Sequence, residues 1–350
     1  MMLSFLLCII LMMQEKTGVK QLYKTESFIK KHMINRNGTL ATYRLRGRAM
    51  DEDEVAGREA LSESSGLWLE YLLKKGDKAA FDQHIQAVYR YLADDSGFIL
   101  WKASENGKEK ASTNALIDDL RIIEQLYRAY DMYGDEAYRQ EAGRISKAVL
   151  SYNRDALFYV DYYDVRLKKS GNTLTVSYIN PAPFRMMKEH GVIVEQQYRE
   201  IVAFLQELPQ KGWAFPKTYR NGIYQYDAEI NMIDQSYVAY HRSLAGILSP
   251  EYTAFLKKQF EREGKLYGRY NLQTGKPAVS FESPALYGLT ILYLLETGEG
   301  EFAEQLYKRM KQFCNVNPLS QFHGGYMSGR NTHIFDNLLP LLAEQKRTPG

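Results

Sequence analysis

A helical hydrophobic period, broken repeatedly by short turns, constrains the fold of this chain more than any other feature. Beyond residue 20, apolar residues recur every three or four positions over most of the sequence, as in amphipathic helices. The interruptions combine helix-ending and helix-starting residues: Lys75-Gly76-Asp77, Tyr133-Gly134-Asp135, Leu248-Ser249-Pro250 and Thr297-Gly298-Glu299. Because these connections are short, the helices that they join should run antiparallel. The pattern predicts an all-α protein built from helical hairpins.

The period also gives the expected extent of each helix. Helices are predicted at residues 18–33, 60–75, 77–94, 112–134, 135–152, 193–208, 227–246, 249–264, 281–297, 299–314 and 332–345. Short strands are predicted at 39–46 and 97–101, with a hairpin formed by 157–167 and 173–177. No linker rich in Gly, Ser or Pro divides the chain. We therefore expect one domain over residues 18–350, an α/α toroid whose inner helix ends surround a cleft.

Composition indicates which class of molecule the chain binds. The 350 residues carry a net charge of only +3, and no run of Lys and Arg exceeds two or three residues, so nucleic acid is not the expected partner. The chain has 27 Tyr against 3 Trp. Tyr offers a sugar ring an apolar face and a hydroxyl, although many of these side chains will instead line helix–helix contacts. This composition suits a monomer that binds carbohydrate.

The N-terminus bears on the cellular compartment. Residues 1–13 form an apolar run that is shorter than the roughly 20 residues a membrane span needs, but as long as the core of a signal peptide. A basic segment and a small-residue cleavage site are missing, and the sequence around Cys8 only loosely resembles a lipoprotein signal. A buried N-terminal helix is the alternative. The sequence favours a secreted or membrane-anchored, extracytoplasmic protein, with residues 1–17 as the signal or anchor segment.

Several kinds of catalytic site find no support in the sequence. The six His include no pair at helical spacing, and Cys8 and Cys314 lie in very different settings, so neither a zinc site nor a disulfide framework is expected. No Gly-rich phosphate loop is present, and Ser62 and Ser65 lack the elbow of a serine hydrolase. We expect neither a metal nor a cofactor.

Three acidic residues at or near the starts of expected helices are the strongest functional signal. Glu63, Asp119 and Asp227 lie on three different hairpins, whose inner ends would meet at one mouth of a toroid. Each has a simpler interpretation as a first-turn charge or a helix cap. Asp119, however, shares a face with apolar residues, where an unpaired charge is costly. Two carboxyl groups in opposite protonation states are what glycosidic cleavage needs, and a third would raise the pKa of the acid.

The segments around these acids resemble glycoside hydrolase family 8. Ser62-Glu63-Ser64-Ser65-Gly66-Leu67 is similar to the family's acid motif Ser-Glu-Gly-Gln-Gly-Tyr, and Tyr226-Asp227-Ala228 to the start of its base motif Tyr-Asp-Ala-x-Arg. Its helix signature is matched in register by Asp119, Ile122, Ala129 and Tyr133. Two further segments are similar, Leu100-Trp101-Lys102 and Asn180-Pro181-x-x-Phe184, so the resemblance runs from about residue 55 to 300. The chain departs from the motifs at Ser64, Ser65, Ile117 and Ile230.

The resemblance implies an (α/α)6 barrel and an inverting, metal-free glycosidase. Glu63 would be the general acid, Asp227 the general base and Asp119 a substrate-binding acid. Further substrate contacts are expected from Asp118, Trp101, Tyr178 and Tyr226. Retained acids beside altered neighbours favour the branch that degrades bacterial exopolysaccharides, including N-acetylated hexosamine polymers, by endo cleavage. An inactive polysaccharide-binding barrel, and a lyase that uses a Tyr or His base, are the alternatives.

Overall fold

A computed structural model describes residues 24–47, 55–94, 98–155 and 158–347, so the predicted N-terminal segment 1–17 lies outside the described residues. Residues 24–32 are helical. The other α-helices are α2 (Ser62–Lys75), α3 (Lys78–Tyr91), α4 (Leu116–Tyr133), α5 (Glu136–Tyr152), α6 (Pro181–Glu189), α7 (Glu195–Gln206), α8 (Met232–Leu244), α9 (Pro250–Glu263), α10 (Pro284–Glu296), α11 (Gly300–Met310) and α12 (Phe335–Arg347).

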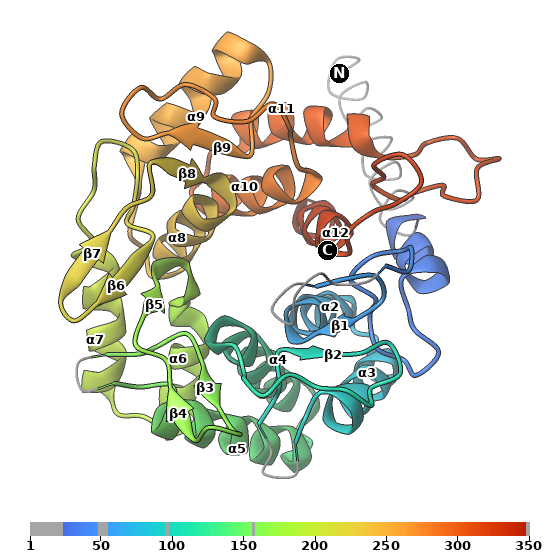
Figure 1. Ribbon diagram of the computed structural model, residues 1–350, viewed down its shortest axis with the longest axis vertical. Helices are drawn as coiled ribbons and strands as arrows, with labels where there is room; N and C mark the ends of the chain where they lie inside the picture. The colour runs from blue at the N-terminus through green and yellow to red at the C-terminus, as the bar shows by residue number, and fades with distance from the viewer. Residues whose placement is uncertain (1–23, 48–54, 95–97, 156–157, 348–350) are drawn as a thin grey trace, which may run out of the picture.

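Alternate helices form two concentric layers (Figure 1). Each of the inner helices α2, α4, α6, α8, α10 and α12 contacts the next one in this order, and α12 contacts α2, which closes the ring. The helices between them in sequence pack outside the ring, as α3 does on α2, α5 on α4 and α11 on α10. The architecture is therefore an (α/α)6 barrel, which confirms the expected fold class.

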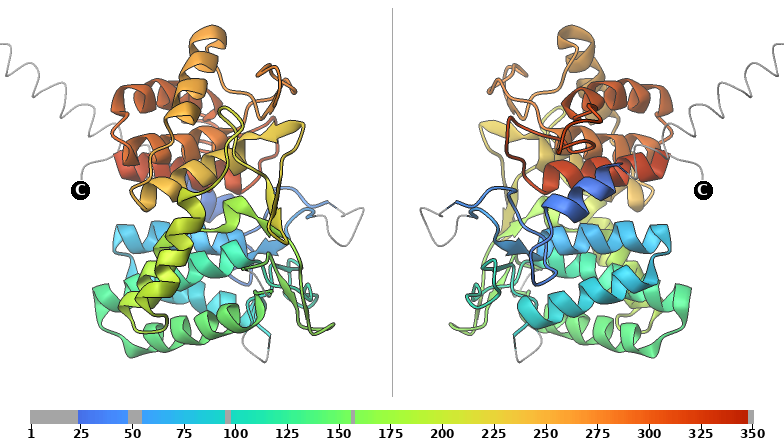
Figure 2. Two further views of the ribbon diagram at one scale, coloured as in Figure 1. Left: turned by 90° about the vertical axis from the view of Figure 1, so that its left-hand side faces the viewer. Right: turned by 90° about the vertical axis from the view of Figure 1, so that its right-hand side faces the viewer.

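The two ends of the barrel differ because the connections alternate in length. The C-terminal end of each of α2, α4, α6, α8 and α10 is joined to the following outer helix by a short turn. Gly76 and Gly134 end α2 and α4 in the left-handed conformation, and Asp77 and Asp135 cap the next helices by accepting from Ala80 N and Ala137 N. The return connections 92–115, 153–180, 207–231, 264–283 and 311–334 are long and gather at the opposite end (Figure 2).

The strands are short, and all except β1, which directly precedes α2, lie within these long connections. β1 (Ala60–Leu61) pairs with β2 (Lys102–Ala103), and β3 (Tyr163–Asp164) with β4 (Lys169–Ser170), both antiparallel. β5 (Leu174–Thr175), β6 (Thr218–Arg220) and β7 (Ile223–Gln225) form a three-stranded sheet in that order. β8 (Glu229–Asn231) pairs with β9 (Arg269–Asn271). The pairs β1–β2, β5–β6 and β8–β9 join different segments over the N-terminal ends of the inner helices (Figure 2).

Several sequence-based predictions of the elements were wrong. The segments 157–167 and 173–177 do not form the predicted hairpin, because β3 pairs with β4 and β5 pairs with β6. Helix α6 was not predicted, because its Pro residues indicated a loop, although Pro181 occupies the first turn, where it is tolerated. Residues 227–231 lie in a loop and strand β8, so the next inner helix begins at Met232. Residues 39–46 contain isolated bridges, such as Tyr43 with His333, instead of a continuous strand.

Helix α10 packs closely against α12, and its side chains are buried on nearly every side. A Cβ atom at Gly288 would lie 2.6 Å from the backbone of Leu339 and Pro340 in α12. Only glycine therefore allows these two helices their close approach. Trp68 is also buried and stacks on Tyr71, as expected for a residue of the core.

Candidate functional site

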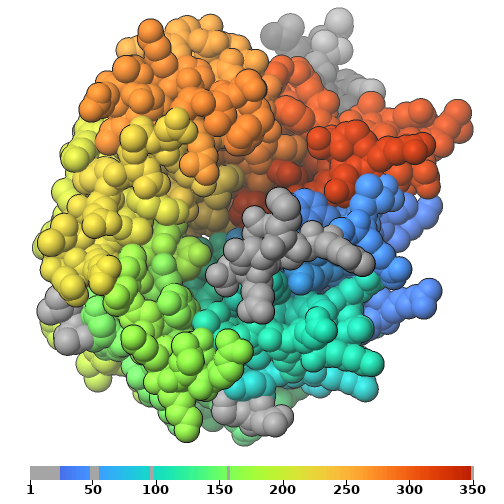
Figure 3. All heavy atoms as spheres, viewed as in Figure 1, coloured from blue at the N-terminus to red at the C-terminus, as the bar shows by residue number. Residues whose placement is uncertain are grey.

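A cavity of about 540 Å³ opens at the loop end of the barrel, over the N-terminal ends of the inner helices. Figure 3 shows this face, on which segments from early, middle and late parts of the chain lie around the centre. The residues that carry its chemistry are acids and aromatic or amide side chains: Glu63, Trp101, Asn114, Asp118, Asp161, Tyr162, Ser177, Tyr178, Asp234, Tyr237 and His333. Segments far apart in sequence thus deliver four carboxyl groups to one cavity.

Glu63 lies in the first turn of α2, directly after strand β1. The amide of Ser62 donates to Trp101 O at 3.0 Å, which fixes the start of the helix against the β2 segment. The Glu63 side chain is 30% exposed. Burial and the charge of Asp118 raise its pKa to about 7, against the opposing effect of Arg121. A carboxyl group with this pKa can hold a proton near neutral pH, as a general acid needs to do.

Asp118 is the second acid of the cavity and lies in the first turn of α4. Its carboxylate accepts a hydrogen bond of 2.7 Å from Ser62 Oγ. It also forms an ion pair with Arg121, whose Nη1 lies 3.1 Å from Asp118 Oδ1. Burial raises its pKa, while Arg121 and the Ser62 hydroxyl act in the opposite direction. The expected substrate-binding residue Asp118 is therefore in the cavity and adjacent to Glu63.

Asp119 points away from the cavity, contrary to the expectation that it would reach substrate. It is 1% exposed, and its Oδ2 accepts from Asn114 Nδ2 at 2.7 Å. Asn114 is held in turn by Asn153. Burial raises the pKa of Asp119 well above its usual range. Consecutive residues of a helix differ by about 100° in direction, so Asp118 and Asp119 cannot both face the cleft.

Asp227 also lies away from the lining of the cavity. It is exposed in the connection between β7 and β8, and Asp234, seven residues further on, occupies the cavity. Asp234 is in the first turn of α8, where Ser177 Oγ donates to its Oδ1 at 3.0 Å and Lys217 Nζ to its Oδ2. The expectation that Asp227 lies at the start of this inner helix was therefore wrong, because α8 begins at Met232.

Asp161 is a fourth acid of the cavity, and no sequence pattern indicated it. Its carboxylate accepts from the Thr175 amide at 2.6 Å and from the Thr175 hydroxyl at 2.8 Å. Burial raises its pKa to about 6. Asp161 lies in the long connection that precedes α6, and no periodicity or motif marks it. Only the pairing of that loop with neighbouring segments brings it to the cavity.

Two of the three aromatic residues proposed for sugar stacking line the cavity. Trp101 and Tyr178 are both partly exposed there. Burial and the nearby carboxylates, Asp161 first among them, raise the pKa of the Tyr178 hydroxyl. Tyr226 lies elsewhere: its hydroxyl donates to Pro209 O at 2.6 Å, and Lys211 lies 4.3 Å from its ring centroid.

The described residues also bear on metal binding and membrane insertion. In these ranges, no cluster of three or more His, Cys, Asp and Glu side chains is arranged to hold a metal ion. Within the same part of the chain, none of the helices has the length and apolar character needed to cross a bilayer.

Comparison with known proteins gives a relative of similar length and many structures of the same fold. No protein-family model matches the chain. Over 338 residues it is 37% identical to "Putative lipoprotein YdaJ" of Bacillus subtilis (strain 168), which covers 95% of this chain and 88% of that protein.

Among solved structures, a novel α-amylase from Clostridium perfringens superimposes with a TM-score of 0.83 at 24% identity, covering 93% of this chain and 98% of that one. PssZ from Listeria monocytogenes superimposes with a TM-score of 0.73 at 26% identity, covering 92% and 94%. Endoglucanase Cel10 of Klebsiella pneumoniae, a family 8 glycosyl hydrolase, gives 0.63 at 16% identity, covering 92% and 99%. The chain thus has a divergent form of the family 8 fold, as its motifs indicated.

Proposed function

The chain belongs to the same family as YdaJ of Bacillus subtilis, and we propose that it is an extracytoplasmic glycoside hydrolase that cleaves a β-linked bacterial exopolysaccharide. One observation carries the proposal: Glu63, whose pKa is raised to about 7, shares a cavity with Asp234, an acid that has a cationic partner. A proton donor and an ionised carboxylate in one cleft are the two groups that glycosidic hydrolysis requires.

In this mechanism Glu63 donates its proton to the oxygen of the leaving sugar. Asp234 accepts a proton from a water molecule that attacks the opposite face of the ring, which inverts the anomeric configuration. Lys217 and Ser177 donate to the two oxygens of Asp234 and so orient the base. Asp234 replaces Asp227 in this role because Asp227 does not line the cavity.

The other cavity residues would bind and distort the sugar at the cleavage point. Asp118 lies beside Glu63 and can stabilise positive charge that develops on the sugar ring in the transition state. Trp101 and Tyr178 offer rings on which the apolar faces of sugars can stack. Asp119, buried behind Asn114, would support this wall of the cleft without touching substrate.

The shape of the loop face supports a polymeric substrate and endo cleavage. A second hollow of about 590 Å³ lies over the starts of α10 and α12 and shares His333 with the first. Tyr43, Phe281 and Phe313 line it and offer further aromatic surface. A chain of several sugar units could therefore occupy both hollows at once.

The proposed location outside the cytoplasm rests on the relative and on the N-terminal segment. YdaJ is named as a candidate lipoprotein. The apolar run of residues 1–13 contains Cys8, and anchoring through residues 1–17 would leave the barrel as a single domain facing the polymer.

The rival proposal, an inactive barrel that binds polysaccharide, was motivated by Ser64, Ser65 and Ile230. All three residues are buried and none of them lines the cavity. These three departures therefore leave the acids of the cleft free to act, which favours an enzyme.

The test is a screen of bacterial exopolysaccharides, with products analysed by mass and by the anomeric signals in proton NMR. We expect inverted products from the wild type and their loss in Glu63→Gln and Asp234→Asn, with Asp227→Asn as the matched control. Polymer binding without any product would support the inactive barrel. Wild-type rates in Glu63→Gln would refute the assigned acid.

A further inference from the structure

Arg121 contacts Glu63 and Asp118, the acid pair of the cleft. It is on α4, one turn after Asp118, and is 6% exposed. Its Nη1 lies 3.1 Å from Asp118 Oδ1 and 3.7 Å from Glu63 Oε1, and its guanidinium lies 4.9 Å from the ring centroid of Tyr237. One buried cation thus contacts both acids, but it is closer to Asp118.

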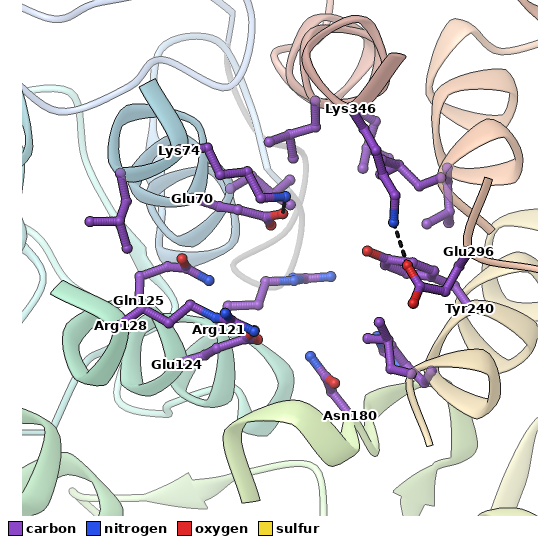
Figure 4. Close-up of a pocket in the computed structure, with 18 of the residues that line it drawn as sticks. Glu70, Lys74, Arg121, Glu124, Gln125, Arg128, Asn180, Tyr240, Glu296 and Lys346 are labelled. Atoms are coloured by element: carbon purple, nitrogen blue, oxygen red, sulfur yellow. Dashed lines mark hydrogen bonds and ion pairs between the residues drawn. The ribbon is translucent and has the colours of Figure 1, made fainter. Parts of the chain in front are cut away.

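Behind Arg121 the barrel interior contains a second cavity, of about 630 Å³, lined by later turns of the inner helices (Figure 4). Three cations that line this interior cavity, or lumen, form ion pairs with acids of the same wall: Lys74–Glu70, Arg128–Glu124 and Lys346–Glu296. Figure 4 shows these pairs around the wall, with Arg121 among them. Within the described residues, the ion pairs of Arg121 are both with acids of the cleft, so its charge is directed there.

The packing of α2 on α4 makes room for this side chain. A Cβ atom at Gly66 would lie 2.8 Å from the Cβ of Arg121, closer than side chains normally approach. Glycine inside a helix is unfavourable, so its presence here fits a requirement for close approach. Gly66 also follows Glu63 by one turn, so the same helix carries the acid and the space for the cation that faces it.

We infer that Arg121 is a positioning residue that keeps the single proton of the Glu63–Asp118 pair on Glu63. The inference rests on the proposed function, in which Glu63 is the proton donor. Arg121 and Ser62 both donate to Asp118, and these contacts favour its ionised form, whereas Glu63 has only the longer contact with the cation. Without Arg121 the two acids would share the proton, as adjacent carboxyl groups do.

Other charged and titratable groups face the pair from the surrounding elements. They are Asp234 and Tyr237 on α8, Tyr178 before α6, Asp161 with Lys217 in the loops, and His333 before α12. Burial lowers the pKa of His333, so it is neutral near pH 7. Among the residues that the structure describes, Arg121 is the cation that forms ion pairs with both members of the pair.

Loss of the cation has two separable consequences. Both proton dissociations of the pair should move to higher pH, because a positive charge within 4–6 Å lowers the pKa of a carboxyl group by about 1 to 3 units. The proton would also spend less time on Glu63, so kcat should fall by about tenfold or more, with a smaller change in KM. A purely structural role would lower kcat without moving the alkaline limb of the pH profile.

The closing experiment follows the carboxyl ¹³C signals of Glu63 and Asp118 through a pH titration, with kcat measured over the same range. Arg121→Met should raise the pKa of the last dissociation by about one unit or more. Arg121→Lys should keep the dissociation near its wild-type position, and Gly66→Ala should shift it as Arg121→Met does. Arg128→Met, which removes a lumen cation from the same helix, is the matched control.

An unchanged titration in Arg121→Met would overturn the inference, as would a shifted titration with an unmoved alkaline limb. Because the titration needs no substrate, it also separates the inference from the proposed function. A wild type that cleaves no glycan refutes the function, while the carboxyl signals still report whether Arg121 sets the position of the proton.

Discussion

Replacing Glu63 by Gln should stabilise the protein above neutral pH, because the catalytic geometry places a carboxyl group where its charge is unfavourable. Glu63 has an ordinary pKa of 4.5, and the fold raises it to about 7 through burial and the charge of Asp118. This difference of roughly 2.5 units corresponds to about 3 kcal/mol between the protonated and ionised forms. The side chain is 30% exposed, so solvent screening reduces this figure only in part.

The sign follows from which state binds the proton more tightly. The folded protein does, so the stabilisation from protonated Glu63 is complete below about pH 4.5 and is lost as the pH rises through about 7. Gln is neutral throughout and does not incur this loss. The stability of Glu63→Gln relative to wild type should therefore increase by about 3 kcal/mol between about pH 4 and pH 8.

The assay is urea unfolding of wild type and Glu63→Gln at several pH values over this range, followed by far-ultraviolet circular dichroism. Asp227→Asn, a change at an exposed acid, is the control and should follow the wild-type curve. A stability difference between Glu63→Gln and wild type that stays constant with pH would refute the argument that burial and Asp118 hold the proton on Glu63.

Three other predictions concern the base, the sugar platform and the ring of helices. Asp234→Asn should lower kcat by about 10²- to 10⁴-fold while Asp227→Asn leaves it unchanged, as measured by reducing-end release; equal losses would remove Asp234 from the base role. Trp101→Ala should raise KM for polymer by about two- to tenfold through lost stacking, and an unchanged KM would place the sugar elsewhere. Gly288→Ala should destabilise the fold by about 1–3 kcal/mol in urea, because the added methyl group meets the α12 backbone; a gain in stability would contradict that packing.

The barrel could be predicted because the sequence features that specify its helical hairpins are local. Helical periodicity, glycine at helix ends and aspartate caps such as Asp77 act within a few residues, so the hairpins can be read directly from the sequence. Helix α6 was not predicted because Pro181 and Pro183, taken alone, indicate a loop. Its position in the ring depends on contacts with α4, α7 and α8, which no local pattern encodes.

The site was predictable where the helix start was predictable. Glu63 begins α2 as expected, and it lies in the cavity. We expected an acid in the first turn of the inner helix that is now α8. The residues before Met232 form strand β8 instead, so the acid in this first turn is Asp234 and not Asp227. The motif register selected Asp119, but Asp118 is the acid that lines the cavity. The directions of the two side chains depend on how α4 rotates against its neighbours, which the register does not record.

Asp161 and Arg121 could not have been found in the sequence. Asp161 reaches the cavity through a long loop that pairs with distant segments, and its role depends on Thr175. Arg121 looks like an ordinary helix cation until α2 brings Glu63 within 3.7 Å. Both residues acquire their chemistry from tertiary contacts, and sequence spacing does not record these contacts.

The alternation of short and long connections has a consequence for the electric field of the cleft. Since every short turn follows an inner helix, all inner helices direct their N-terminal ends toward the loop face. Each of these ends carries a partial positive charge of about half an elementary unit from its unpaired amide groups. Glu63, Asp118 and Asp234 all lie in such first turns, so the backbone contributes a fixed positive potential that cannot titrate. The same topology that closes the ring therefore makes it possible to gather several acids at one mouth.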